Sequence, residues 1–442
     1  MGKQPLSQAN PGPAPVEKSS LGHLLASVGP GFVYVLTVLG TGDVVTNSTA
    51  GASYGYHLIW ALGMTLVFRY VWVNTSAKYV LVTGESLLVG YGRVGKWVPW
   101  VVSLSFFPIR HFTNMFLILI MGDSAHMLVP LPTVWSAKIW AGLFTLIGFS
   151  MMYWGGYHII ESFCKLLIAV MGVSMLVAAL LSDPDPVAIL EGALLPNLPQ
   201  AQGLYDAVWI VMALIGTEAG STANLTYAYF IREKGWTDTS YLKQQRLDLA
   251  VGVFCLFAMG ALLQIAAAGT IHPLGIQVQD TQDLSRIFSE TQGKIGLIVF
   301  ALGLWGSAFS SFIGFNSGYA MVLTDICRSF VPRLKRSQSS SEKSEIKKDP
   351  IYRALIIFWS FVPAYVIFTE TRPIWLILMV MVCIVLVIPI LAISLLQITN
   401  DRKLMGRYTN GWFTNGVLVM LTLIAFWSAY NNGIQLWKNV GG

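Results

Sequence analysis

Two acidic residues lie beside glycines inside long apolar segments of this 442-residue chain. Asp43 follows a Gly-Thr-Gly sequence at 40–42, and Glu218 follows a Gly-Thr pair at 216–217. Glycine loosens a helix, and an ionised carboxylate inside a bilayer is costly unless it has a partner. Carboxylates beside breaks in membrane helices are typical of sites for cations or polar solutes, because unwound backbone frees carbonyl and amide groups. We therefore expect these two breaks to form one site.

The polar residues around each carboxylate are spaced to share a pocket. Residues three or four positions apart lie on one helical face, and both carboxylates have polar neighbours at these spacings. A site built of oxygen atoms favours hard cations such as Mg²⁺, Ca²⁺ or Mn²⁺. The hydroxyl groups have an alternative role, which is hydrogen bonding to carbonyls of their own helices. The predicted metal ligands are Asp43, Glu218, Thr41, Asn47, Ser221 and Thr222.

Further polar residues extend this site along two other apolar segments. Arg110 cannot face lipid at low cost, so we expect it to face the bundle interior, a cavity or a carboxylate. With His111 and Asn114 it forms a candidate proton path, although a hydrogen-bonded structural role for the histidine is equally consistent with the sequence. Asn316 belongs to a segment of small polar residues that either lines a pathway or packs tightly. The predicted substrate pathway is Gly40, Gly216 and Asn316.

The elements that carry these residues are membrane helices. The chain is 55% hydrophobic and only 11% charged, with a mean hydropathy of +0.62, so it cannot hide its apolar surface in a soluble core. We expect an all-α, polytopic membrane protein with about eleven spans. These are placed near 29–53, 57–82, 97–122, 135–154, 158–181, 205–231, 247–271, 293–327, 351–369, 373–398 and 412–432.

Basic residues indicate how the helices are oriented. The net charge of +6 is concentrated in alternate loops, with roughly 19 Lys and Arg on one side and about five on the other. The positive-inside rule places the N-terminus in the cytoplasm, and we expect a multi-pass protein of the plasma (inner) membrane that binds no nucleic acid. Residues 1–27 lack the apolar core of a signal peptide and are expected to form a disordered cytoplasmic tail.

The two broken segments lie about 175 residues and five spans apart, the offset of an inverted five-plus-five repeat. The transporter domain is predicted at 28–442. It comprises repeats at about 28–182 and 204–400, and an extra helix at 411–433.

Several short motifs, in order, resemble the NRAMP family of proton-coupled divalent metal transporters. Residues 29–32 match its opening Gly-Pro-Gly-Phe, and 399–406 resemble the Thr-Ser-Asp-Arg-Arg-Leu-Met-Gly after its tenth helix. The resemblance implies the leucine-transporter fold, with the ion between broken first and sixth helices. The family's Asp-Pro-Gly-Asn aligns with 40–43, which puts glycine at the metal-binding aspartate and Asp43 at the asparagine. Its Met-Pro-His falls within 219–223, where no thioether or histidine is present, so the site is closer in character to magnesium-transporting relatives.

Three functions are consistent with the sequence. The first is secondary-active transport of a divalent cation, magnesium or manganese, by alternating access, with proton coupling left open. The second is a carrier of a small organic solute, in which helix N-termini and Arg110 bind an anionic group. The third is a transport-inactive sensor or partner subunit. An enzyme is not expected, since no nucleophile–base set or phosphate-binding loop is found, and no cofactor is predicted beyond the metal as substrate.

Overall fold

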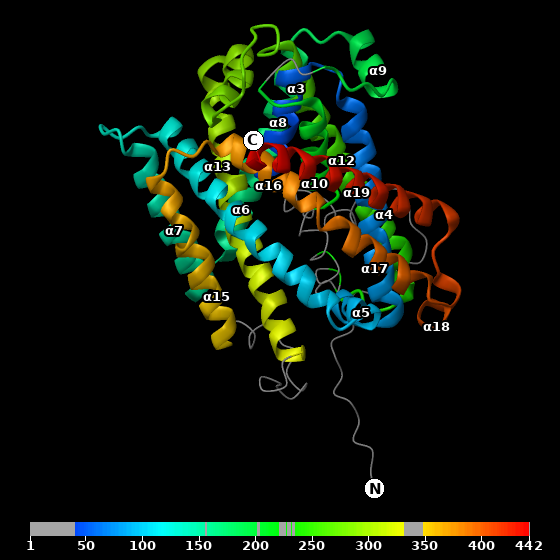
Figure 1. Cartoon of the computed structure of the whole chain (residues 1–442). Coiled ribbons are helices and arrows are strands. Elements are labelled where there is room, and N and C mark those ends of the chain that lie inside the picture. Colours follow the sequence, from blue (N-terminus) through cyan, green and yellow to red (C-terminus); the bar gives the residue numbers. More distant parts are fainter. Residues whose placement is uncertain are drawn as a thin grey trace.

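The helices of this chain form one bundle, shown in Figure 1. The computed structural model describes residues 40–154, 157–200, 204–220, 227, 231, 235–330 and 348–441. Across these ranges the regular structure is helical and no strand is found, which confirms the predicted all-α class. Helices occupy the described parts of all the predicted spans.

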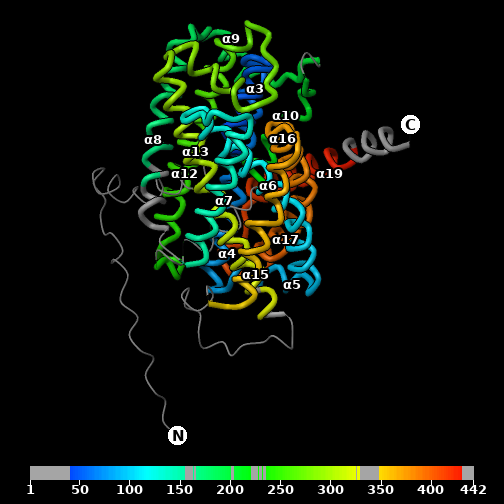
Figure 2. Tube along the Cα trace, turned by 90° about the vertical axis from the view of Figure 1, so that its left-hand side faces the viewer, coloured from blue at the N-terminus to red at the C-terminus, as the bar shows by residue number. Residues whose placement is uncertain are grey.

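The first half of the chain supplies most of the site. Its helices are α3 (Thr41–Tyr54), α4 (Ile59–Thr83), α5 (Leu87–Val94), α6 (Val98–Leu128), α7 (Ser136–Trp154), α8 (Tyr157–Leu181) and α9 (Pro186–Leu194). Every residue of α3 except Ser53 is buried, so this helix lies inside the bundle. The bundle extends from α9 at one end to α5 at the other (Figure 2).

The second half begins with the short helix α10 (Ala207–Glu218). It continues with α12 (Leu242–Gly269), α13 (Thr281–Phe330), α15 (Pro350–Phe361), the 3-10 helix η3 (Pro363–Phe368), α16 (Pro373–Val385), α17 (Ile388–Asn400), α18 (Arg402–Met405), the 3-10 helix η4 (Gly406–Tyr408) and α19 (Trp412–Gly441). Helix α13 is broken at Gly293, where φ is 61°, and the predicted span began at this residue. Helices α16 and α17 together fill one predicted span.

Six helical segments of the described chain are individually long and apolar enough to cross a membrane. They are Val98–Leu128, Thr239–Gly269, Thr281–Arg328, Pro350–Phe368, Pro373–Asn400 and Trp412–Tyr430. A bent pair, Leu166–Leu181 with Pro186–Leu194, turns by 114° and could supply one more. Helices α3 and α10 are shorter, with 14 and 12 residues.

Close packing of α3 against α12 depends on a glycine. A Cβ on Gly51 would overlap the carbonyl oxygen of Gln264 and would lie 2.9 Å from the Cβ of Ala267. Glycine therefore allows the two backbones to approach, as small residues do where membrane helices cross. This contact fixes the position of the helix that carries Asp43.

We predict that Gly51→Ala lowers the thermal unfolding midpoint of the detergent-purified protein, because overpacking costs about 1–3 kcal/mol. Tryptophan fluorescence during heating measures the midpoint. Gly142→Ala is the matched control, since no atom lies within 4 Å of the added Cβ in α7. Equal midpoints for the two variants would contradict the packing role of Gly51.

Candidate functional site

Helix α3 begins two residues before Asp43, and the first part of the predicted broken segment lies outside the described residues. Gly40 has extended backbone (φ −85°, ψ 166°), and α3 begins at the next residue. The Asp43 carboxylate accepts a hydrogen bond from the Gly40 N–H through Oδ2, at 2.7 Å. A carboxylate in the first turn also interacts favourably with the positive end of the helix dipole. Asp43 therefore stabilises the start of the helix with one oxygen, and its Oδ1 is left for other contacts.

Glu218 occupies the opposite kind of helix end. Helix α10 ends at Glu218, and the Gly220 N–H bonds back to the Ile215 carbonyl at 3.1 Å. A carboxylate at a helix C-terminus meets the negative end of the dipole, which is unfavourable. Glu218 is only 1% exposed, so water cannot compensate for this cost and a cationic partner is needed.

Arg69 of α4 is that partner, and it also connects the two carboxylates. Its Nη1 donates a short hydrogen bond to Glu218 Oε2 and lies 4.0 Å from Asp43 Oδ1. The arginine is 1% exposed, so the three charges form a buried ion triad. The prediction that Asp43 and Glu218 lie together is supported by this geometry, but a guanidinium group bridges them.

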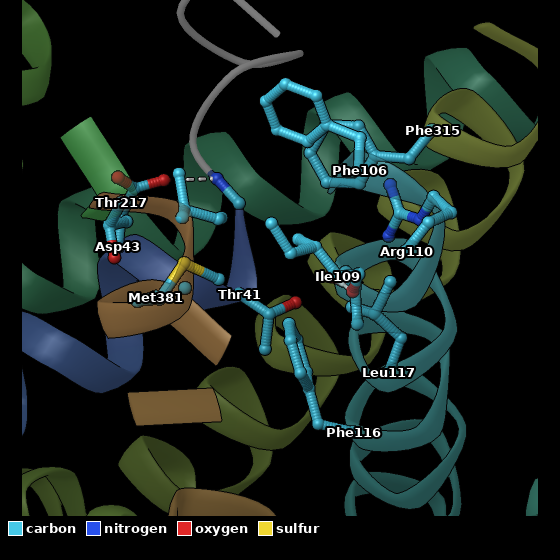
Figure 3. A pocket seen from close by; sticks show the side chains of 14 residues that line it. Thr41, Asp43, Phe106, Ile109, Arg110, Phe116, Leu117, Thr217, Phe315 and Met381 are labelled. Atoms are coloured by element: carbon cyan, nitrogen blue, oxygen red, sulfur yellow. Dashed lines mark hydrogen bonds between the residues drawn. The ribbon is translucent and has the colours of Figure 1, made fainter. Parts of the chain in front are cut away.

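A cavity of about 40 Å³ lies beside the ion triad, between the start of α3 and helix α6 (Figure 3). This is room for a few water molecules or one partly hydrated ion. Arg69 and Glu218 are not part of its wall. The lining residues are Gly40, Thr41, Gly42, Asp43, Phe106, Ile109, Arg110, Thr113, Phe116, Leu117, Thr217, Phe315, Met381 and Ile384.

Two buried oxygen atoms of α3 lack a hydrogen-bond partner at this cavity. They are Thr41 Oγ1 and Asp43 Oδ1, in residues that are 1% and 4% exposed. Both atoms have unused hydrogen-bonding capacity beside the cavity, so they are available to water or to another ligand there. By contrast, Thr217 at the same cavity donates its hydroxyl to the Ala213 carbonyl at 2.8 Å.

Met381 of α16 brings a thioether to the cavity, where the sequence predicted only oxygen ligands. A Cβ placed on Gly42 would lie 3.2 Å from Met381 Cε and 3.8 Å from its Sδ. Figure 3 shows the Met381 sulfur among the lining side chains. The oxygen-only ligand set therefore stays a prediction, to which α16 adds a sulfur atom from a part of the chain that the helix-break motifs do not include.

Arg110 reaches the cavity from α6, as predicted. It is 3% exposed, and its Nε and Nη2 have no hydrogen-bond partner. Its Cζ lies 4.8 Å from the centre of the Phe315 ring, a cation–π contact. No carboxylate of the described residues pairs with it. Of the two buried arginines near the cavity, Arg69 lies behind the wall and is paired with a carboxylate. Arg110 lies in the wall and has no carboxylate partner among the described residues.

Other predicted ligands and pathway residues face different partners. Asn47 is fully buried against α12, where its Oδ1 accepts from Gln264 Nε2 at 2.9 Å, so it packs helices and does not line the cavity. Gly216 also has a packing role, because a Cβ there would overlap the Met381 carbonyl. Gly40 does line the cavity. Ser221 and Thr222 lie outside the described residues.

The candidate proton-path residues point in different directions. His111 Nε2 lies 3.4 Å from the Tyr365 hydroxyl in η3, away from the cavity. Asn114 donates through Nδ2 to Asn316 Oδ1 at 2.8 Å and joins α6 to α13. Asn316 is fully buried in this contact and is absent from the cavity wall. The structure does not connect these residues into one chain.

Two functional candidates, Arg69 and Met381, were missed by the ligand prediction. Arg69 had a usable signal, since a single arginine deep in an apolar segment requires a carboxylate partner. Met381 had none, because a methionine in a strongly apolar helix is usually a core residue. In the described parts of the chain, no three His, Cys, Asp or Glu side chains are grouped to hold a metal, so any metal here must use other donor atoms as well.

Comparisons with known proteins agree with this arrangement. The sequence pattern of the family described as "Natural resistance-associated macrophage protein-like" matches residues 31–435. The divalent metal cation transporter MntH of Aeromonas hydrophila is 24% identical over 413 residues, which cover 92% of this chain and 95% of that protein. MntH of Erwinia tasmaniensis is also 24% identical, over 90% of this chain and 92% of that protein.

Solved structures identify the fold. A histidine-to-alanine variant of the Eremococcus coleocola manganese transporter matches with a TM-score of 0.68 and 16% identity, over 94% of this chain and 88% of that one. Mhp1, a nucleobase-cation-symport-1 family transporter, matches with a TM-score of 0.54 and 12% identity, over 92% of each chain.

The fold is thus that of the polytopic, leucine-transporter-like membrane transporters. Within this class, the chain belongs to the Natural resistance-associated macrophage protein-like (NRAMP) family. It is a multi-pass membrane protein, and the predicted resemblance is confirmed.

We predict that Arg69→Met destabilises the protein by about 3–5 kcal/mol, because it leaves buried carboxylates without a partner. Arg110→Met removes an equally buried guanidinium that has no carboxylate partner, and it should not destabilise. Denaturant or thermal unfolding in detergent measures both variants. Adding Glu218→Met to Arg69→Met should recover most of the lost free energy of unfolding. If the destabilisation of the double variant equals the sum of the two single destabilisations, the ion triad is contradicted.

Proposed function

We propose that this protein is a secondary-active transporter of a divalent metal cation that works by alternating access. Family membership supports the class, and MntH relatives whose names specify divalent metal cation transport align over most of the chain. Two atoms support a binding position for the ion: Thr41 Oγ1 and Asp43 Oδ1. Both lack a hydrogen-bond partner, and both lie where the extended backbone of Gly40 is followed by α3.

In this proposal the ion contacts Asp43, Thr41 and Met381 from the cavity. The carboxylate supplies charge, the hydroxyl supplies a neutral oxygen, and the thioether supplies a soft ligand. Hard Mg²⁺ and Ca²⁺ bind thioethers poorly, whereas transition-metal ions accept them. We therefore favour Mn²⁺ or a similar transition-metal ion over Mg²⁺ as the substrate.

Glu218 can bind the ion only after it separates from Arg69. Its carboxylate is held by Arg69 and does not line the cavity. We assign Asp43 as the first ligand. Glu218 becomes a second ligand if a change of conformation separates it from the guanidinium. The ion triad then serves as an internal counter-ion that keeps the carboxylates compensated when no metal is bound.

The orientation and energy source are parts of the same proposal. Alternate loops rich in Lys and Arg support a cytoplasmic N-terminus and a plasma (inner) membrane location. Proton coupling stays a candidate, with His111 beside Tyr365 as the titratable group of α6 that the sequence singled out. Its distance from the cavity implies that any coupling is indirect.

We predict that Asp43→Asn weakens Mn²⁺ uptake into proteoliposomes by at least tenfold, because a charge-assisted contact worth about 1.5–3 kcal/mol is lost.

Met381→Leu should lower Mn²⁺ uptake more than Mg²⁺ uptake and so shift selectivity toward the harder ion. Isotope flux or a metal-sensitive dye inside the vesicles provides the measurement.

Met379→Leu is the matched control, since Met379 is in the same helix but outside the cavity wall. If both methionine variants change the two fluxes equally, the thioether has no role in selectivity. Uptake of a solute without any metal would refute the proposal. Running the vesicles with an imposed pH gradient tests proton coupling, and flux that ignores the gradient would exclude His111 as a relay.

A second candidate function is favoured by the unpaired guanidinium of Arg110 in the cavity wall. A planar guanidinium binds a carboxylate through two parallel hydrogen bonds. The nearby first turn of α3 also carries partial positive charge. A small organic carboxylate could therefore be the transported solute, with Arg110 as its anchor.

For this second function we expect small carboxylates such as acetate to raise the thermal midpoint of the purified protein at constant ionic strength. Arg110→Gln should abolish that rise, since glutamine lacks the positive charge and the two parallel N–H donors of the guanidinium group. Arg353→Gln is the control, because Arg353 lies over the Tyr153 ring at 5.3 Å and away from the cavity. The absence of any carboxylate-dependent shift in the unchanged protein would exclude this candidate.

A further inference from the structure

A second, larger hollow lies at the end of α4 that is remote from the start of α3. Three basic side chains converge there from distant parts of the sequence: Lys78 of α4, Arg246 of α12 and Arg407 of η4. Figure 1 shows α18, which directly precedes η4, next to the end of α4. We call this hollow the basic pocket. Its volume is about 350 Å³, and it is lined by Tyr70, Asn74, Lys78, Arg246, Arg407, Tyr408, Thr409, Gly411 and Thr414.

The charge of the basic pocket is not compensated within the described chain. Lys78 is 7% exposed, and its Nζ donates to the neutral Asn410 Oδ1 at 2.6 Å. Arg407 donates to the Tyr408 hydroxyl at 2.9 Å. Among the described residues, none of the three cations forms a salt bridge with a carboxylate, and no acidic residue lines the hollow. An anion bound among these three cations would therefore gain attraction from all of them, and from the buried Lys78 most of all.

The remaining lining residues suit an anion with several oxygen atoms. Tyr70, Tyr408, Thr409 and Thr414 carry hydroxyl donors, and they lie around the cations. A phosphate group accepts hydrogen bonds through several oxygens and pairs well with arginine. The volume of the hollow also exceeds what a single small ion would fill, so the ligand is larger than a halide.

The rim of the basic pocket places it at the level of lipid headgroups. Helix α19 begins at Trp412, directly after the lining residue Gly411. Trp412 and Phe413 are 87% and 56% exposed, which is unusual for large aromatic side chains in a folded protein. Exposed aromatic residues at the end of a membrane helix mark the interface between hydrocarbon and water. A ligand in this hollow therefore has lipid beside it.

We propose that the basic pocket binds the phosphate group of an anionic phospholipid. The lipid would neutralise Lys78, Arg246 and Arg407 while its acyl chains lie along α19. Basic pockets between membrane helices are suited to anionic headgroups. Such a lipid would contact α4, α12 and the α18–α19 connection, so it would tie together three segments that are distant in the sequence. This proposal does not depend on which solute is transported.

The test uses the full-length protein purified in detergent, with its thermal midpoint followed by tryptophan fluorescence. Phosphatidylglycerol added to the micelles should raise the midpoint more than phosphatidylcholine does. The double change Arg246→Gln with Arg407→Gln should weaken the apparent affinity for phosphatidylglycerol by about tenfold or more, because charge-assisted hydrogen bonds are lost. Both arginines are exposed, so the fold should tolerate the change.

Arg402→Gln with Lys403→Gln is the matched control, since it removes the same charge from the exposed face of α18 outside the hollow. This control variant should keep the response of the unchanged protein. Equal loss in both double variants would indicate general surface charge and overturn the proposal. An equal rise with inorganic phosphate at matched ionic strength would assign the pocket to a soluble phosphate and overturn the lipid assignment.

Discussion

The arginine between two buried carboxylates is the interaction on which the centre of this protein depends. Arg69 bonds to Glu218 at the C-terminal end of α10 and lies 4.0 Å from Asp43 in the first turn of α3. Without it, one carboxylate would oppose a helix dipole and both would be buried without compensation. Helices α3 and α10 are therefore linked by charge as well as by packing, and α4 supplies the charge that links them.

This arrangement gives the cavity an unusual electrostatic balance for a cation site. In their charged forms, Asp43 and Glu218 contribute two negative charges, and Arg69 and Arg110 contribute two positive charges, so the four side chains sum to zero. A site with no net charge attracts a divalent cation less than one with two free carboxylates does, so a rearrangement of these charges would strengthen binding. Arg69 could exchange its carboxylate contacts, and Arg110, which has no carboxylate partner among the described residues, could move away from the cavity.

Sequence reasoning predicted the fold, and it predicted that Asp43 and Glu218 lie together, because both inferences rest on local properties. Apolar segment length gives the helices, and glycines beside Asp43 and Glu218 give the breaks. It failed for contacts made at long range. The role of Asn47 is set by Gln264 of α12, and the thioether of Met381 enters from a helix more than three hundred residues further along the chain than Asp43. Helical spacing shows which face a residue occupies, but the helix opposite that face is determined by the whole topology.

The contact between Gly216 and α16 has a mechanical consequence. The missing side chain lets the backbone of α10 rest directly against the carbonyl of Met381, whose sulfur lies in the cavity wall. A tilt of α16 would thus act at two points together, drawing the thioether out of the cavity and removing the support behind Glu218. In the transport cycle proposed above, ligand release and the opening of one access route would then be a single movement of one helix.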